Sequence, residues 1–231
     1  MHLKVIALKY AEGILPGRLV IAEGNESNSV KAPFLFYLIQ LDDKNILVDV
    51  GGKDMPGYYD KYRKPLIVLN EYGLQSTDID YVIITHAHSD HIEELYEYKH
   101  ATIYIQEDEL TIGLKNGYIS KEYNVQSFQE ETILLDILKI KKIGGHTKGS
   151  SIVSFLHDEH EYVLCGDECY IPECFTQRIP TGNSYNPENS KDFINKYSNL
   201  YYKIFTFHDP NILLGKNGFQ VIFEADLNQI M

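Results

Sequence analysis

The stretch THAHSDHIEE, residues 85–94, places three histidines and an aspartate within six consecutive positions. It follows the apolar run YVII, which is typical of a buried strand. Side chains alternate along an extended backbone, so His86 and His88 are predicted to project to one side while Ala87 points away. Two imidazole rings then face one point at the end of a strand.

The chain must turn after His88, and Ser89 and Asp90 are residues that favour turns. Such a turn brings Asp90 and His91 to a neighbouring point, so that one loop supplies ligands to two metal ions. Imidazole nitrogen with carboxylate oxygen is the donor set of zinc or a similar first-row ion, whereas calcium and magnesium prefer oxygen. The density of the motif favours a metal site over chance.

Three more candidate ligands stand where other predicted strands end. His146 lies in the run GGHT, Asp167 in the run GDE, and His208 follows the run FTF. The glycines beside His146 and Asp167 allow close approach of the backbone at a crowded centre. The remaining histidines lack such positions, and we interpret them as surface or hydrogen-bonded residues: His2, His100, His157 and His160.

Strands dominate the predicted secondary structure, with helices between them. Apolar, β-branched or aromatic runs predict strands at residues 3–8, 34–41, 46–50, 81–85, 102–105, 132–135, 137–140, 151–156, 162–165, 204–207, 212–214 and 219–223. The turn-forming residues 42–45 join the second and third runs in a predicted hairpin. No linker or low-complexity tract divides the chain, so we predict one α/β (α+β) domain, residues 1–231, with antiparallel or mixed sheets.

Two helices are predicted from their end signals and periodicity. Pro65 suits a first helical turn and Gly73 suits a C-terminal cap, which places a helix in the run PLIVLNEYG. Beyond Ser190, a candidate N-cap, apolar residues fall at helical spacing: Phe193, Ile194, Tyr197, Leu200 and Tyr201. We interpret that stripe as core packing.

Composition argues against several classes of protein. The net charge of −12 and the pI near 5.1 would repel a phosphate backbone, so we expect no nucleic-acid partner. Lys4 and Lys9 interrupt the apolar start and no run is long enough for a membrane span, which predicts a cytoplasmic protein with no membrane partner. The cysteines are interpreted as reduced thiols, with a zinc site as the alternative: Cys165, Cys169 and Cys174.

The ordered motifs THAHSDH, GGHTKGS, GDECY and FHDP resemble the metallo-β-lactamase superfamily, whose hallmark is H-x-H-x-D-H followed by a distant His, Asp and His. The runs ILVDVGG and GLQSTDIDYVIITH resemble the approach to that motif, and the likeness spans residues 5 to about 223. It implies a four-layer αββα sandwich with a metal site at the edge of two central sheets. By this resemblance, the first metal would be bound by His86, His88 and His146, and the second by Asp90, His91 and His208. Asp167 would bridge the two metals.

Within the superfamily, the sequence looks most like the N-acyl homoserine lactone lactonases. The implied activity is that of a metal-dependent, dizinc hydrolase, in which a hydroxide between two divalent ions opens a lactone or cleaves a related ester or thioester. Manganese and iron are the alternative metals, and the partner is a small-molecule substrate. Tyr170, three residues beyond Asp167, would donate a hydrogen bond to the developing oxyanion, and Asp90 would carry a proton to the leaving group. Monomer and homodimer both stay open.

Other activities of the superfamily fit less well. A glyoxalase-II-like thioesterase normally needs a helical extension, and the chain is short after His208. Penicillin-hydrolysing members have a cysteine-containing site where this chain has Asp167. A flavin-dependent oxygen reductase would carry a glutamate among its first ligands. The acidic charge of the chain disfavours a nuclease, whose substrate is also negatively charged. The non-enzymatic alternative is a metal-binding module, although a structural site usually has four ligands and no open position.

Substrate specificity is assigned to two segments with many small or turn-forming residues, 10–33 and 172–186. The second contains Phe175 and Tyr185, which would suit either an acyl chain or ordinary packing. Long loops over a rigid sheet edge commonly carry specificity, so we expect both segments to lie beside the metal site.

The sequence departs from the family pattern at two places. The residues after the histidine motif are Ile-Glu-Glu at 92–94 instead of a glycine pair, and Lys148 replaces the usual proline after His-Thr. Both are expected near the mouth of the groove. Cys169 lies between Asp167 and Tyr170, and we interpret it as a packing residue close to the metals.

Overall fold

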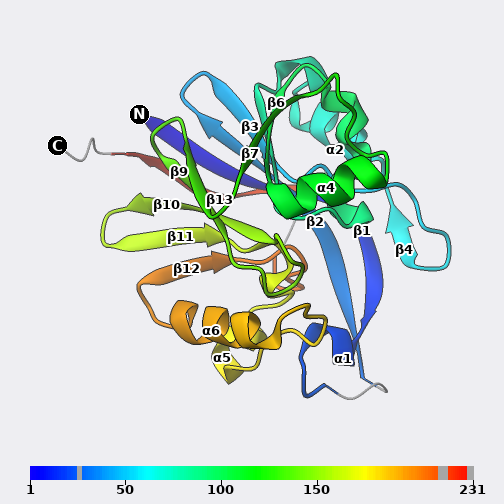
Figure 1. The fold of residues 1–231 in the computed structure, drawn as a ribbon, viewed down its shortest axis with the longest axis vertical. Helices are drawn as coiled ribbons and strands as arrows, with labels where there is room; N and C mark the ends of the chain where they lie inside the picture. Colours follow the sequence, from blue (N-terminus) through cyan, green and yellow to red (C-terminus); the bar gives the residue numbers. More distant parts are fainter. Residues whose placement is uncertain (25–27, 213–217, 228–231) are drawn as a thin grey trace.

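Two β-sheets pack face to face in the described chain, and helices cover their outer faces (Figure 1). The computed structural model describes residues 1–24, 28–212 and 218–227. The chain builds most of the first sheet, continues through the second sheet and returns to the first with its last strand. Both sheets contain antiparallel and parallel pairs, so the predicted αββα sandwich with mixed sheets is confirmed.

The first sheet contains β1 His2–Pro16, β2 Ser29–Leu41, β3 Lys44–Val48, β4 Tyr59–Tyr62, β5 Tyr81–Ile84, β6 Thr102–Gln106, β7 Asn124–Phe128 and β13 Phe219–Asp226. Its order is β13-β1-β2-β3-β5-β6-β7, and β4 pairs with β1. The pairs among β13, β1, β2 and β3 are antiparallel, whereas β3, β5, β6 and β7 run parallel. Leu41 pairs with Lys44, so β2 and β3 form the predicted hairpin.

The second sheet contains β8 Glu131–Leu134, β9 Leu138–Lys142, β10 Ser151–His157, β11 His160–Leu164 and β12 Tyr202–Phe205. Its order is β12-β11-β10-β9-β8. Neighbours are antiparallel except β11 and β12, which run parallel because a helical crossover separates them in the chain. The strand ends that precede the candidate ligands therefore belong to both sheets.

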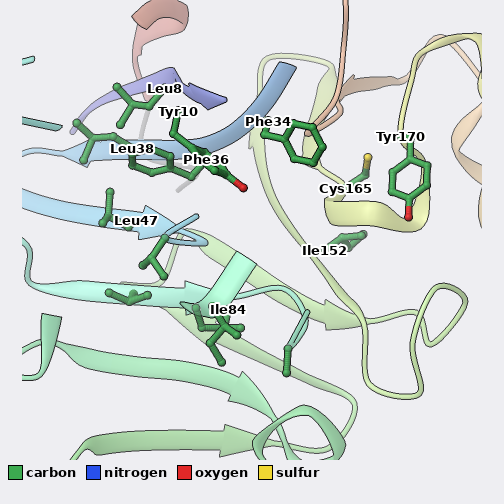
Figure 2. Close-up of a cluster of buried hydrophobic side chains, with 14 of the residues drawn as sticks. Leu8, Tyr10, Phe34, Phe36, Leu38, Leu47, Ile84, Ile152, Cys165 and Tyr170 are labelled. Atoms are coloured by element: carbon green, nitrogen blue, oxygen red, sulfur yellow. The ribbon is translucent and has the colours of Figure 1, made fainter. Parts of the chain in front are cut away.

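Side-chain alternation divides the apolar residues between an inner and an outer core. On β1, Val5 and Ala7 belong to the cluster between the sheets, which also contains residues of β9 and β10. Ile6 and Leu8 point the other way and join the cluster that packs beneath the helices. Figure 2 shows part of this outer cluster, in which Leu8 and Tyr10 lie close to the side chains of neighbouring strands. Burial of these side chains is the main favourable contribution to folding.

The helices are α1 Gly17–Val20, α2 Pro65–Tyr72, α3 Ser89–Ile92, α4 Glu107–Lys115, α5 Glu173–Gln177 and α6 Pro187–Tyr197, with short 3₁₀ helices η1 Ser76–Asp78, η2 Glu93–Tyr98 and η3 Gly166–Glu168. The prediction for α2 is confirmed, because Pro65 occupies its first turn and Gly73 ends it with a left-handed φ of 111°. Across residues 1–24, 28–212 and 218–227, no helix is both long and apolar enough to cross a membrane.

Helix α6 begins earlier than predicted. Its N-cap is Asn186 and not Ser190, because the Asn186 side chain accepts hydrogen bonds from the backbone N–H groups of Glu188 and Asn189. Pro187 follows at the first helical position, where its missing N–H costs nothing. Ser190 is buried inside the helix, so the predicted cap was wrong.

The C-terminal part of the chain differs from prediction in two further ways. Helix α6 ends at Tyr197, and Leu200 and Tyr201 lie beyond it with exposed side chains. A strand was expected at residues 212–214, but Ile212 is outside any strand, and residues 213 and 214 lie outside the described residues. The strand predicted at 219–223 is confirmed as part of β13.

Residues 10–16 and 29–33 are strand, so the prediction of loop structure for segment 10–33 was wrong at both of its ends. It contains the end of β1 and the start of β2, which stay paired as far as Pro16 and Ser29. Gly13 and Pro16 gave the impression of a turn, but both lie within β1. A Cβ atom at Gly13 would meet the backbone oxygen of Tyr58 at 2.8 Å, so the glycine is explained by the close approach of the chain before β4.

Candidate metal centre

Side chains with metal-binding chemistry meet at one edge of the sandwich, and each of them was a candidate ligand from the sequence. They fall into two groups, and within each group the ligand atoms lie within 4.8 Å of one another. The first group is His86, His88 and His146, and the second is Asp90, His91, Asp167 and His208. In the first sheet, His86 and His88 follow β5, and Asp90 and His91 lie in the next helix, α3. In the second sheet, His146 follows β9, Asp167 lies in η3 after β11, and His208 follows β12. Loops of both sheets thus build the site.

The first group consists of three histidines. The Nδ1 atom of His88 lies 3.1 Å from Nε2 of His86 and 3.0 Å from Nε2 of His146. The rings of His86 and His146 are perpendicular, with centroids 4.7 Å apart. Ala87, between His86 and His88, is buried and belongs to the outer hydrophobic cluster.

The second group joins two carboxylates to two histidines. Nε2 of His91 lies 3.6 Å from a carboxylate oxygen of Asp90 and 3.3 Å from Oδ1 of Asp167. Nε2 of His208 lies 3.4 Å from the same oxygen of Asp167. Asp90 is partly exposed, while the other three side chains are buried.

Asp167 stands between the two groups and offers one oxygen to each. Oδ1 faces His91 and His208, whereas Oδ2 lies 3.8 Å from Nε2 of His86 and 3.6 Å from Nε2 of His146. A carboxylate in this position is able to bind two cations at once, one through each oxygen.

Backbone carbonyl groups fix two of the imidazole rings. The Nδ1–H group of His146 donates to the carbonyl of Asn183 at 2.8 Å, and that of His208 donates to the carbonyl of Pro33 at 3.0 Å. Because a carbonyl only accepts, each of these two rings carries a proton on Nδ1, and its Nε2 atom faces the site. Such outer hydrogen bonds are a usual feature of metal-binding histidines.

A buried carboxylate performs the same task for the remaining buried rings. Asp49 accepts a hydrogen bond from Nδ1 of His91 at 2.7 Å, and from the backbone N–H and the hydroxyl of Thr85 at 2.8 and 2.7 Å. The hydroxyl oxygen of Thr85 lies 3.1 Å from Nδ1 of His86 and accepts from it. Asp49 therefore orients His91 directly and His86 through Thr85.

Electrostatics favour the neutral forms of His86 and His146 and the cationic form of His91. Burial lowers the pKa of His86 well below its usual range and that of His146 to about 4. Burial also disfavours the charged form of His91, yet the carboxylates of Asp167, Asp90 and Asp49 together hold the pKa of His91 well above its usual range. Burial would raise the pKa of Asp167, but His91 and His208 hold it well below the usual value.

The residues fit divalent metal ions. Nε2 of His91 and Oδ1 of Asp167 are buried and have no hydrogen-bond partner within the described part of the chain, although buried polar atoms are nearly always satisfied. Neutral imidazole nitrogens and carboxylate oxygens are the donors that zinc and similar first-row ions prefer. A cation at each group would satisfy these atoms.

Aromatic side chains line the site beside His208. The ring of Phe34 stands edge-on to that of His208 with centroids 4.6 Å apart, and the ring of Tyr58 lies 5.7 Å from that of Phe34. Tyr10 donates from its hydroxyl to the backbone oxygen of Asp90 at 3.0 Å. Burial, with Asp90 nearby, raises the pKa of Tyr58 to about 12, so its hydroxyl stays neutral. These rings form an apolar wall with hydroxyl groups at its edge.

Tyr170 lies against both groups, and the structure places its ring at centroid distances of 5.7 Å from His146 and 5.1 Å from His208. The side-chain amide of Asn183 donates to the Tyr170 oxygen at 3.0 Å. Burial raises the pKa of the Tyr170 phenol well above its usual range, so its own O–H is available as a donor. Figure 2 shows Tyr170 and Phe34 at the end of the outer core nearest to Cys165.

Three residues singled out from the sequence take part in packing. Phe175 packs on Phe193 of α6, and the thiol of Cys169 is buried and donates to the backbone oxygen of Ile171. Ile92 belongs to the core and not to the mouth of a groove, because its side chain is fully buried. Of residues 92–94, Ile92 packs in the core, whereas the carboxylate of Glu93 pairs with Lys53 at 3.3 Å.

Other predictions about the neighbouring segments have mixed outcomes. Tyr185 is exposed, although its backbone N–H donates to the carbonyl of His146 at 3.1 Å. Lys148 is on the surface and pairs with Asp108 at 2.7 Å. The prediction of a crowded backbone is confirmed at Gly145, where a Cβ atom would lie 2.3 Å from a carboxylate oxygen of Glu168.

The sequence analysis missed the residues behind the ligands. Asp49 stands at the end of a buried strand, where a lone carboxylate is a signal in itself. Two buried glutamates, Glu109 and Glu168, hold the loop that carries His146. Asn183 gave no signal, because its role depends on a backbone carbonyl and on a partner, Tyr170, that is distant in sequence.

Comparisons with known proteins agree with this architecture. The sequence model of the metallo-β-lactamase superfamily matches residues 35–195, which include six of the seven candidate ligands. A curated protein of Methanocaldococcus jannaschii, named as a probable metallo-hydrolase, is 30% identical over 164 residues, which cover 71% of this chain and 70% of the relative.

Solved structures share the fold at low sequence identity. An N-acyl homoserine lactone hydrolase with N-hexanoyl-L-homoserine bound at its catalytic metal centre has a TM-score of 0.76 and 19% identity, over 90% of this chain and 93% of that one. A probable metal-dependent hydrolase from Staphylococcus aureus has a TM-score of 0.76 and 20% identity, over 99% of this chain and 98% of that one. AidC, a dizinc quorum-quenching lactonase, has a TM-score of 0.73 and 16% identity, over 98% of this chain and 96% of that one.

The family assignment rests on the matched sequence, and the structural relatives add the fold. More than two thirds of the chain matches the superfamily's sequence model or a curated relative, and the sandwich carries its histidine and aspartate residues at the same edge on which both sheets converge. This chain belongs to the metallo-β-lactamase superfamily.

Proposed function

We propose that the protein is a metal-dependent hydrolase that holds two divalent ions, zinc in the first instance. His86, His88 and His146 would bind one ion, Asp90, His91 and His208 the other, and Asp167 both: this assignment is supported by the two donor groups. The observation that carries the proposal is that the two oxygens of Asp167 face different groups. A purely structural zinc site is usually closed by four ligands and has no such shared position.

Two divalent ions at these groups would supply Lewis acidity and lower the pKa of a bound water toward neutrality. The protein's own residues then position the substrate and move protons. Tyr170 donates a hydrogen bond to the carbonyl oxygen as negative charge develops there, since its phenol is protonated and its oxygen is already held by Asn183. Asp90, the partly exposed carboxylate, would take up the proton that the attacking water releases and pass it to the leaving oxygen as the bond between the carbonyl carbon and that oxygen breaks.

The proposed substrate class is a lactone or a related ester or thioester, with N-acyl homoserine lactones as the first candidates. Phe34 and Tyr58 offer apolar surface next to His208, which suits an acyl group. Among the described residues, Asp90 and Asp167 form their ion pairs with histidines. Two structural relatives are lactonases, which supports the same class.

The test is acid release from N-acyl homoserine lactones of varied chain length, with protein reconstituted with zinc, manganese or cobalt. We expect turnover by the wild-type protein, loss of turnover in His86→Ala, and unchanged turnover in His100→Ala, which removes an exposed histidine. Protein that holds two ions and opens none of the lactones would overturn the lactonase assignment and direct the search to thioesters and other esters. Protein that holds no ions would overturn the metal centre as well.

A further inference from the structure

Glu109 is a buried carboxylate outside the two ligand groups. It lies in the first turn of α4, and its side chain is fully buried. One oxygen, Oε2, accepts a hydrogen bond from the backbone N–H of Ala87 at 2.8 Å. The other, Oε1, accepts from the hydroxyl of Thr147 at 2.6 Å and from the backbone N–H of Gly149 at 2.9 Å. Both oxygens are therefore used, and neither bonds within α4.

These hydrogen bonds join the two loops that carry the first donor group. Ala87 lies between His86 and His88, while Thr147 directly follows His146. The three histidines of the group thus come from two pieces of chain that meet at one carboxylate. Any change in the distance between these loops changes the distance of His146 from the other two rings.

The packing around this carboxylate leaves little freedom. A Cβ atom at Gly149 would lie 2.1 Å from the side-chain oxygen of Gln106 and 2.9 Å from Cγ of Glu109, so the loop touches the start of α4 directly. Hydrogen bonds from N–H and O–H groups to a carboxylate are shorter and stronger than those between neutral groups. A buried carboxylate with three donors is accordingly a rigid junction.

We propose that Glu109 is a positioning residue that sets the geometry of the His86, His88 and His146 group and so the affinity of that group for its metal ion. The proposal rests on the metal-binding part of the proposed function and adds a residue that touches no metal. It differs from a merely structural role, which would change the stability of the fold and not the affinity of one group.

Stepwise titration with zinc, in competition with a chromophoric chelator, separates the two roles. In Glu109→Gln one acceptor oxygen becomes an N–H₂ group that faces other donors, so we expect one of the two binding steps to weaken by about 10–100-fold, the range typical of outer residues at metal sites. The second step should change less than about twofold. Cobalt loaded in place of zinc should show an altered visible spectrum in the weakened step only.

Asp108→Asn is the matched control, because it makes the same chemical change at the adjacent position of α4. Asp108 pairs with Lys142 and Lys148 at 3.1 and 2.7 Å near the surface, where ion pairs contribute little. Both binding steps of this variant should equal those of the wild-type protein. Equal weakening in Asp108→Asn and Glu109→Gln would overturn the proposal.

Thr147 provides a second test that does not depend on the folding of a glutamate variant. Thr147→Val removes the hydroxyl that donates to Glu109 and should weaken the same binding step, whereas Thr147→Ser keeps the hydroxyl and should restore it. If Glu109→Gln and Thr147→Val bind zinc with wild-type affinity at both steps, the proposal is overturned. It is also overturned if these variants weaken both binding steps equally. A wild-type protein that fails to bind two ions would instead overturn the proposed function on which it rests.

Discussion

Asp49 occupies a backbone conformation that few residues adopt. Its φ of 60° lies in the left-handed region, where aspartate is one of the more tolerated residues other than glycine. This conformation places the carboxylate where it accepts three hydrogen bonds, from Thr85 and His91. The strain is compensated by the fixed orientation of a ring that faces Asp167.

Replacement of Asp49 by asparagine should weaken metal binding. The amide can accept through one atom only, so either His91 or Thr85 loses its partner, and we expect affinity at the second group to fall by about 10–100-fold. Asp42→Asn is the matched control, since Asp42 has a similar φ of 50° but lies in the turn between β2 and β3. Calorimetric zinc titration measures both variants, and equal affinities would contradict the role given to Asp49.

Tyr170 makes a separate contribution to turnover. Tyr170→Phe removes the proposed oxyanion donor and leaves the ring in place, so kcat should fall by about a hundredfold while two ions stay bound. Tyr197→Phe is the control, because it removes the phenol of a buried tyrosine in α6 and should change neither kcat nor the number of bound ions. Unchanged kcat in Tyr170→Phe would exclude that tyrosine from the mechanism.

Among the elements, β1, β2 and β4 are joined by one carboxylate. Glu12 on β1 pairs with Lys9 at 2.5 Å, Lys61 of β4 at 3.1 Å and Lys31 of β2 at 3.5 Å. The hydrogen bond from Lys9, with that from Lys61, lowers the pKa of Glu12 to about 2 despite partial burial. Its ionised form therefore stabilises the folded state.

Glu12→Gln tests this junction through its dependence on pH. Because the folded pKa is below the unfolded one, the stabilisation is present above pH 4.5 and is lost as the pH falls toward about 2. After allowance for solvent screening, we expect a loss of about 2 kcal/mol in the free energy of unfolding at pH 7. Urea unfolding should show the difference between the variant and the wild-type protein shrinking below pH 4.5 and in high salt. A difference that is constant with pH would contradict the ionic origin.

The elements that could be predicted are those with strong local signals. The strands with continuous apolar runs, the hairpin of β2 and β3, and α2 with its terminal Pro65 and Gly73 were all found. The sequence analysis missed β4 and β7, whose sequences YDKY and NVQSF are largely polar, because β4 pairs only with β1 in the described sheet and β7 lies at its edge. It also missed α4, which contains Gly113 and Thr111, both weak helix formers.

At the scale of the whole molecule, the site depends on both sheets. The candidate ligands were predictable because they stand at strand ends and belong to a dense motif. Their outer partners were not, because Asp49, Asn183 and Glu109 meet the ligand loops only through tertiary contacts between distant segments. The local sequence pattern thus identified the candidate ligands, and the tertiary fold determines how their side chains are oriented.

Removal of the metal ions should therefore destabilise the entire sandwich. An ion present at a thousand times its Kd stabilises the folded state by about 4 kcal/mol, and two such ions by about 8 kcal/mol. Chelation of both should therefore lower Tm by roughly 20 °C in a chain of this size. We expect a single transition, since we propose that residues 1–231 form one domain. Zinc, but not calcium, should restore the original Tm. A Tm that chelation leaves unchanged would contradict the coupling between site and fold.

The measurement that tests the central claim most directly is anomalous X-ray diffraction at the zinc absorption edge from crystals of zinc-loaded protein. We predict two anomalous peaks, one among His86, His88 and His146, the other among Asp90, His91 and His208, with an oxygen of Asp167 beside each. A single peak, or peaks bound by other residues, would contradict the account of a two-ion centre.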